Sequence, residues 1–153
     1  MQNGRTLEAT EKFLREKIPL TAAMDLRVVE APGDGFAVEA PVSRNHNHLG
    51  TAFGGSINAV ATLAGYALLW LELGESAQLV IRASSIRFLR PVRATIRARC
   101  APPSRAQLEA FREELARKGR ARIALRVRVE ENQELAAEFE ATFVATTKAR
   151  GES

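Results

Sequence analysis

The amino-acid sequence predicts an α+β fold in which a curled, antiparallel sheet of six strands surrounds one long buried helix. Residues 52–71 carry no charged side chain, and a helix that is apolar on every side belongs in the interior of a globular protein. Elsewhere apolar and polar residues mostly alternate, as they do along half-buried strands. Short turn signals separate these strands, which favours antiparallel pairing. A sheet that curls around the helix would bury the helix and one sheet face together.

The first 41 residues predict a helix followed by a β-hairpin. Apolar residues at helical spacing indicate a helix over residues 6–17, and Pro19 ends it. Alternating residues then indicate a hairpin over residues 24–41, with its turn at residues 31–35, Ala-Pro-Gly-Asp-Gly.

The same two patterns, helical spacing and strand-like alternation of apolar residues, predict the later elements. The buried helix opens at Gly54-Gly55 and ends near Gly74. Ser104 and Gln107 have the spacing of a capping box, and they open an amphipathic helix over residues 104–118. The other predicted strands are residues 79–89, 93–100, 123–129 and 135–143.

Length and composition favour one domain, residues 1–153, in the cytoplasm. The chain has the length of a single domain. Its one cysteine, Cys100, excludes an internal disulfide and fits a reducing compartment, and the first residues lack the apolar core of a signal peptide. Ser56, Asn58 and Thr62 interrupt the apolar stretch and strands surround it, so we expect no membrane partner.

The net charge of +4 is distributed unevenly. No acidic residue occurs from Ser76 to Leu108, a segment that holds seven arginines. These arginines form either an exposed charged face or a site for an anionic ligand, since the guanidinium fork matches phosphate oxygens. Nucleic acid is disfavoured as a partner, because only Phe88 is interleaved with the arginines to stack on a base.

The Gly54-Gly55 pair is the strongest functional signal in the chain. Backbone N–H groups in the first turn of a helix lack intrahelical acceptors, and the helix dipole is positive there. Such donors can hold a carbonyl oxygen or an anion. The structural alternative is that the glycines let the helix enter a tight space.

Three segments of the chain form a recognisable pattern: Asn47-x-x-Gly50-Thr51-x-Phe53-Gly54-Gly55-Ser56-Ile57, Gly65-x-x-Leu68-Leu69 and Ile86-x-Phe88-Leu89-Arg90-Pro91-Val92. This pattern resembles a small family of thioesterase-like hotdog domains, found alone or fused behind an acetyltransferase domain. The resemblance covers residues 18–147, with the helix at 104–118 as an insertion. It implies a hotdog fold, an acyl-coenzyme A or acyl-carrier thioester as ligand, and a homodimer or dimer of dimers with a shared site.

Two positions depart from the pattern of the better-known hotdog thioesterases. Those enzymes have His-Gly-Gly where this chain has Phe53 before the glycines, and they often carry an acid nine residues later. Here that position is Thr62, which cannot act as a carboxylate base, and the only acid of the helix is Glu72, near its far end. The fold therefore transfers better than the mechanism.

The resemblance and the residue chemistry together give the predicted site. Gly54 and Gly55 would stabilise negative charge on the thioester oxygen. Asn47 would orient a water or donate to the carbonyl, or else form an Asx turn. His48 would help position the water, and either His48 or His46 could act as a general base. Two histidines without Cys or Asp neighbours are too few for a metal site, so we expect no metal and no cofactor beyond the coenzyme A moiety of the substrate.

The remaining candidates would bind substrate. Ser56 would cap the helix or touch the substrate. Asn58, Thr62 and Tyr66 form a polar stripe at i, i+4 and i+8 that would line the acyl pocket or the dimer seam, or be satisfied by backbone groups. The other predicted substrate contacts are His46, Phe53, Arg87 and Arg90, the two arginines toward coenzyme A phosphates.

The sequence therefore favours a thioester hydrolase that uses a directed water and helix N-terminal donors. The missing acid at Thr62 keeps a non-catalytic acyl-thioester binding module as the alternative. A hotdog dehydratase is a third interpretation, disfavoured because no His–acid pair of that type is apparent.

Overall fold

The computed structural model describes residues 6–31, 33 and 35–148. Its helices are α1 (Leu7–Lys17), α2 (Pro19–Ala23), α3 (Gly54–Leu73) and α4 (Arg105–Lys118), with short 3₁₀ turns η2 (Val42–Arg44) and η3 (Gly74–Ser76). Its strands are β1 (Arg27–Ala31), β2 (Gly35–Pro41), β3 (Ala77–Phe88), β4 (Thr95–Cys100), β5 (Arg120–Glu131) and β6 (Glu134–Thr147).

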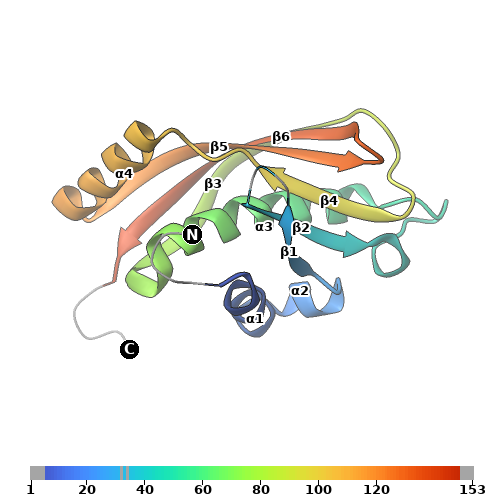
Figure 1. Ribbon diagram of the computed structural model, residues 1–153, viewed down its shortest axis with the longest axis horizontal. Coiled ribbons are helices and arrows are strands. Elements are labelled where there is room, and N and C mark those ends of the chain that lie inside the picture. Colours follow the sequence, from blue (N-terminus) through green and yellow to red (C-terminus); the bar gives the residue numbers. More distant parts are fainter. Residues whose placement is uncertain (1–5, 32, 34, 149–153) are drawn as a thin grey trace.

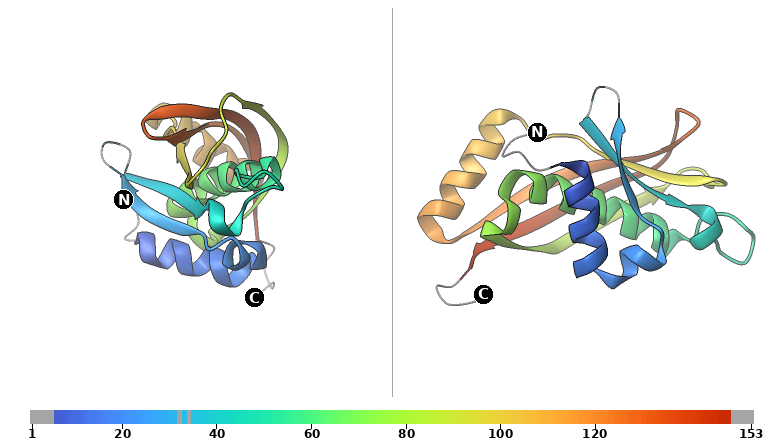
Figure 2. Two further views of the ribbon diagram at one scale, coloured as in Figure 1. Left: turned by 90° about the vertical axis from the view of Figure 1, so that its right-hand side faces the viewer. Right: turned by 60° about the horizontal axis from the view of Figure 1, so that its bottom comes forward.

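The six strands form one antiparallel sheet in the order β1-β2-β4-β5-β6-β3. The sheet lies over α3 along most of the helix (Figure 1), and the end-on view in Figure 2 shows the strands curving around it. This arrangement confirms the predicted α+β plan. Because β1 and β3 are the two ends of the order, they are the edge strands.

Helix α3 is the centre of the hydrophobic core. Twelve of its 20 residues are buried. The largest fully buried side chains of the sheet are Phe139 and Phe143, and the Phe143 ring lies against Gly65 of the helix. By length and composition alone, residues 54–76 could cross a membrane, but 72% of the most apolar window is buried inside the protein. The helix is therefore the enclosed core helix that its all-round apolar pattern predicted.

Helix α1 covers the β1 edge and the side of α3 that the sheet leaves open. The Glu11 carboxylate accepts a hydrogen bond from Val28 N at 3.0 Å, which satisfies an edge donor of β1. The ring of Phe13 stacks on that of Trp70 with centroids 4.7 Å apart. The helix thus takes the place of a further strand at this edge.

The segment between α1 and β1 differs from the sequence prediction. Helix α1 ends at Lys17, before Pro19, as predicted. The sequence did not predict the second helix, α2, in which Pro19 stands at the first position, where a missing N–H costs nothing. Asp25 then turns the chain with φ 54°, and β1 begins at Arg27 rather than at residue 24. The predicted hairpin is correct in its pairing and wrong in its start.

Helix α4 is the inserted helix that the sequence predicted at 104–118. Ser104 and Gln107 form the reciprocal capping box, and Gly119 closes the helix with φ 72°. Phe111 and Leu115 are buried against the first half of β5, beyond the point where β4 ends. Arg112 also donates to the backbone oxygen of Glu72 at 3.0 Å, which ties α4 to the end of α3.

Candidate active site at the start of helix α3

The first turn of α3 presents backbone donors that the helix itself does not use. The first helical hydrogen bond runs from Ile57 N to Phe53 O at 3.0 Å. The N–H groups of Gly54, Gly55 and Ser56 precede it and have no acceptor within the helix. Phe53 is the N-cap residue and no side chain caps the helix, so the predicted capping role of Ser56 is wrong. Ser56 lies inside the first turn rather than at the cap.

Two exposed aromatic rings flank these donors. An added Cβ on Gly54 would lie 3.4 Å from Cζ of Phe88, and one on Gly55 would lie 2.6 Å from Cε1 of Phe53. The Phe53 and Phe88 side chains are 57% and 53% exposed. A ligand that covered both rings would exclude water from the helix start, and hydrogen bonds to developing charge are stronger in such a setting.

The loop before α3 is shaped by Asn47. Its Oδ1 accepts from Leu49 N at 2.9 Å and from Thr51 N at 3.2 Å, while Nδ2 donates to Thr51 Oγ1 at 2.9 Å. Asn47 N also donates to Thr51 O at 2.7 Å. These contacts form the Asx turn that was one of the two predicted roles. A water-orienting role stays a prediction, and it would have to share the same amide.

Both histidines lie exposed on this loop. Nδ1 of His46 lies 3.0 Å from the Asn47 carbonyl oxygen. A neutral His46 would therefore donate from Nδ1 and keep Nε2 as the acceptor, which is the form a general base needs. His48 is exposed beside it. Across residues 6–31, 33 and 35–148, no three His, Cys, Asp or Glu side chains are grouped to hold a metal.

Asn45 is a buried anchor of the loop that sequence reasoning missed. Its Nδ2 donates to Met24 O at 3.0 Å and to Pro41 O at 2.8 Å, and its own carbonyl accepts from Phe53 N at 2.8 Å. The residue therefore joins the ends of α2 and β2 to the residue that precedes α3. Nothing in the sequence distinguishes Asn45 from the exposed polar residues that follow it.

Glu131 is a second anchor that the sequence did not reveal. Its carboxylate accepts from the backbone N–H groups of Arg93, Ala94 and Thr95 at 2.9–3.1 Å. These bonds replace ladder bonds, so β4 begins at Thr95 and not at residue 93 as predicted. Burial raises the pKa of the Glu131 carboxyl, but the three N–H donors and the Arg93 charge outweigh it and lower the pKa overall.

The segment that Glu131 holds also supports the loop at the start of α3. Val92 O accepts from Ala52 N at 2.8 Å, and Ala94 O accepts from Val42 N at 2.9 Å. The β5–β6 turn is thereby connected through two short backbone links to the residues on either side of the Asn47 loop.

A mainly apolar groove of about 490 Å³ starts at Gly55 and follows one face of α3. Its walls come from α3, from the α1–α2 junction and from β3; the lining residues are Ile18, Leu20, Gly55, Asn58, Ala59, Thr62, Leu63, Tyr66 and Ile81. All three residues of the predicted polar stripe are among them. The groove therefore joins the helix-start donors to a surface that suits an acyl chain.

Two residues of the polar stripe are satisfied by backbone oxygens. Thr62 Oγ1 donates to Asn58 O at 2.9 Å, and the Tyr66 hydroxyl donates to Leu79 O at 3.3 Å. Burial raises the pKa of Tyr66, so this hydroxyl stays protonated at neutral pH. Thr62 is thus a wall residue of the groove, and its hydroxyl proton already forms a hydrogen bond with the Asn58 carbonyl.

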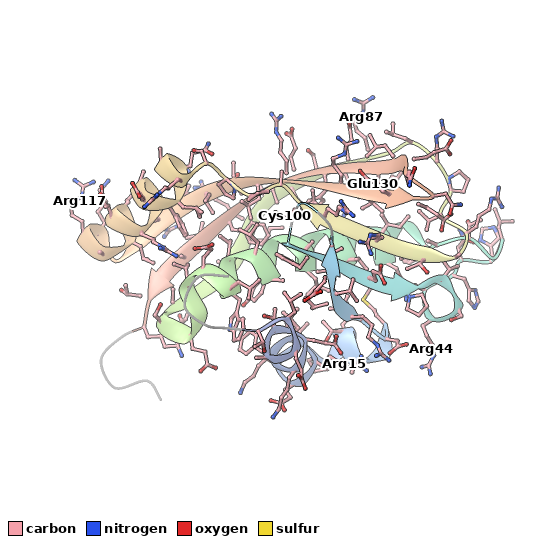
Figure 3. All side chains as sticks on the ribbon, in the orientation of Figure 1. Arg15, Arg44, Arg87, Cys100, Arg117 and Glu130 are labelled. Atoms are coloured by element: carbon pink, nitrogen blue, oxygen red, sulfur yellow. The ribbon has the colours of Figure 1, made fainter. Side chains whose placement is uncertain are left out.

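The two arginines expected to bind phosphate are both exposed and paired with glutamates. Arg87 lies 3.8 Å from Glu138 and Arg90 lies 2.8 Å from Glu134. Arg87 projects from the face of the sheet opposite α3 (Figure 3). Arg90 follows β3, two residues after Phe88, whose ring lies beside Gly54. Of the two, Arg90 is better placed to meet a ligand at α3.

Comparison with known proteins identifies the family. Residues 7–147 match the family described as "Putative thioesterase (yiiD_Cterm)". The chain belongs to this family. The match spans the whole sheet and all four helices.

Solved structures similar to this chain have the hotdog fold. A protein of unknown function from Chlorobaculum tepidum has a TM-score of 0.85 at 25% identity, over 92% of this chain and 94% of that one. A protein from Shewanella oneidensis named as a "putative thioesterase" has a TM-score of 0.80 at 24% identity, over 92% of this chain and 96% of that one. A protein from Pseudomonas aeruginosa named as a probable thioesterase has a TM-score of 0.78 at 25% identity, over 94% and 97%.

Proposed function

We propose that the protein hydrolyses acyl thioesters of coenzyme A or of an acyl carrier protein. One observation carries this proposal: the open N–H donors of the first turn of α3 lie at one end of an apolar groove on the same helix. Attack on a thioester carbonyl places negative charge on its oxygen. Fixed donors aimed at that oxygen stabilise the charge without reorganising, and one such donor can contribute about 3 kcal/mol.

The groove gives the acyl chain a direction. Gly55 belongs both to the helix start and to the groove wall, and Tyr66 lines the groove eleven residues later. At the rise of an α-helix this distance is about 16 Å. A thioester carbonyl at Gly54 and Gly55 would therefore place its acyl chain along Asn58 and Thr62 toward Tyr66.

The Asn47 loop before α3 would have to activate the attacking water, because Thr62 has no basic group. The Nε2 atom of His46 is available as an acceptor, and His48 is exposed next to Asn47. A neutral imidazole is a suitable general base close to neutral pH. Asn47 would orient the water or hold the loop in the shape that lets a histidine do so.

A homodimer would complete this site. Strand β3 is an edge strand of 12 residues whose side chains Val80 and Ile81 are 59% and 40% exposed. Phe88 and Leu89, at its end, are 53% and 45% exposed. A long apolar edge is a template for pairing with a second chain. Antiparallel pairing of β3 with its own copy would cover this edge and enclose the groove beside Ile81.

A non-catalytic acyl-thioester binding module is the second candidate. Thr62 stands where related enzymes place an acid, and its hydroxyl is engaged by the Asn58 carbonyl. A groove without a base would hold the ligand and leave it intact. A hotdog dehydratase is less favoured, because no His–acid pair is found among the described residues at the groove.

Released thiol, measured over a panel of acyl-coenzyme A substrates and one acyl carrier protein, separates these functions. We expect turnover above background with at least one acyl group. Binding of the same ligands with no turnover for any of them would reject the hydrolase in favour of the binding module. Conversion of a 3-hydroxyacyl substrate to an enoyl product would instead indicate the dehydratase.

A further inference from the structure

We propose that Asn58 recognises a polar substituent near the third carbon of the acyl chain, so that the preferred ligand class is a 3-hydroxyacyl thioester rather than a plain saturated one. This inference rests on the proposed site, in which the thioester carbonyl lies at the first turn of α3. It concerns the choice of ligand and holds whether the ligand is hydrolysed or only bound.

The position of Asn58 fixes the distance from the reacting carbonyl. Asn58 follows Gly55 by three residues and both line the groove. Residues at i and i+3 share a helix face, and the rise between their Cα atoms is about 4.5 Å, which is about three to four bonds of an extended acyl chain. Because helical side chains lean toward the N-terminus of their helix, the Asn58 amide lies closer to Gly55 than its Cα does, and the acyl chain reaches it about one bond earlier. The third carbon is therefore the one that faces the amide.

The three residues of the polar stripe differ in the hydrogen bonds that they can still offer to a ligand. The hydroxyl protons of Thr62 and Tyr66 go to the backbone oxygens of Asn58 and Leu79. Among the residues that the structure describes, the Asn58 side-chain amide has no hydrogen-bond partner, although it is half-buried beside Ala59 and Leu63. Asn58 is therefore the member of the stripe with both donors and an acceptor to offer a ligand.

A hydroxyl group fits this amide better than the alternatives. It can donate to Oδ1 and accept from Nδ2, whereas an oxo group could only accept. A saturated chain would cover the amide and displace the water that hydrogen-bonds to it, and it would form no hydrogen bond in place of those lost. Sites built to hydrogen-bond a ligand hydroxyl discriminate strongly against analogues that lack it.

Binding of non-hydrolysable ligands tests the proposal apart from catalysis. The probes are octanoyl- and 3-hydroxyoctanoyl-coenzyme A analogues in which a methylene group replaces the thioester sulfur, measured by calorimetry. We expect the wild-type protein to bind the hydroxylated analogue at least tenfold more tightly. Asn58→Leu keeps a side chain of similar size without the amide, and it should lose this preference or reverse it. Thr62→Val, the matched control one turn further along, should keep the preference.

Equal affinity of the wild-type protein for the two analogues would overturn the proposal. So would an Asn58→Leu variant that weakens both analogues equally, or one that sediments as a monomer while the wild type is a dimer, since Asn58 would then serve the interface. Tighter binding of the hydroxylated analogue without any thiol release would refute only the hydrolase function. Hydrolysis with no preference refutes only this inference.

Discussion

Gly65 of α3 lies so close to Phe143 of β6 that an added Cβ would come within 2.9 Å of Cε2 and 3.0 Å of Cζ of the ring. Phe143 is fully buried, and Leu125 Cδ1 would lie 3.4 Å from the same Cβ. The helix therefore meets the sheet through its backbone at this point. Because the groove and the donor turn are parts of α3, this contact fixes their distance from the sheet.

Gly65→Ala should lower the free energy of unfolding by about 1–3 kcal/mol, the usual cost of overpacking a core. Gly55→Ala is the matched control, because the ring that its methyl group would meet belongs to Phe53 and is 57% exposed. That ring can rotate away, so we expect little change in stability. Urea denaturation measures both variants. Equal destabilisation of the two would show that burial of the neighbouring ring does not decide the cost.

Replacement of Asn47 by Asp and by Ala separates the two roles of this residue. Asp keeps the oxygen that accepts from Leu49 N and Thr51 N, whereas Ala removes it. If Asn47 acts by shaping the loop, kcat should fall by about tenfold or more in Asn47→Ala and stay within a few-fold in Asn47→Asp. An equal loss in both variants would instead assign the function to the Nδ2 donor.

Arg90→Ala should weaken binding of a coenzyme A thioester more than that of a pantetheine thioester, which lacks the nucleotide phosphates. Arg87→Ala is the control, since Arg87 carries the same charge on the sheet face opposite α3. Both ion pairs are exposed, so neither variant should change the thermal midpoint appreciably. Losses that are the same for both ligands would exclude Arg90 as a phosphate contact.

Glu131 should make stability depend on pH in the acidic range. Its pKa is lowered in the folded protein, so its contribution is fully present above the unfolded value of about 4.3 and is lost as the pH falls through the folded value. Glu131→Gln should therefore be less stable than wild type at pH 7, and the gap should shrink below about pH 4. Thermal midpoints across this range measure the gap. A constant gap from pH 7 to pH 3 would mean that the carboxylate charge does not act through these N–H groups.

The sequence predicted elements whose signals are local. The all-round apolar pattern of α3 and the Ser104–Gln107 capping box each determine one helix without reference to the rest of the chain. It could not show that β3 is an edge strand, because strand order depends on contacts between distant segments. The apolar run of β3 was correctly assigned as a strand, yet its exposed side chains became visible only in the folded sheet.

The candidate site divides in the same way. Asn58, Thr62 and Tyr66 could be grouped from helical spacing alone, and they share one groove. Asn45 and Glu131 could not be found, because each binds backbone groups of a segment remote in sequence, Met24 for Asn45 and Arg93 for Glu131. The cap assigned to Ser56 was wrong because the helix begins at Gly54, one turn earlier than a cap at residue 56 requires. The role of a polar residue depends on its contacts in the folded structure, and these cannot be read from the residue type alone.

The most direct test of the proposed site removes one backbone donor from the first turn of α3. Gly54 and Gly55 are the first two helical residues, where proline is tolerated, and Phe53 has the extended conformation (φ −66°, ψ 133°) that a residue before proline prefers. Gly54→Pro and Gly55→Pro each delete an N–H group, whereas Gly54→Ala and Gly55→Ala keep it. Thiol release from the best acyl-coenzyme A substrate is measured for all four folded variants. We expect kcat of at least one proline variant to fall about 100-fold or more below its alanine partner. Proline variants that stay within a few-fold of their alanine partners would contradict oxyanion stabilisation by the start of α3.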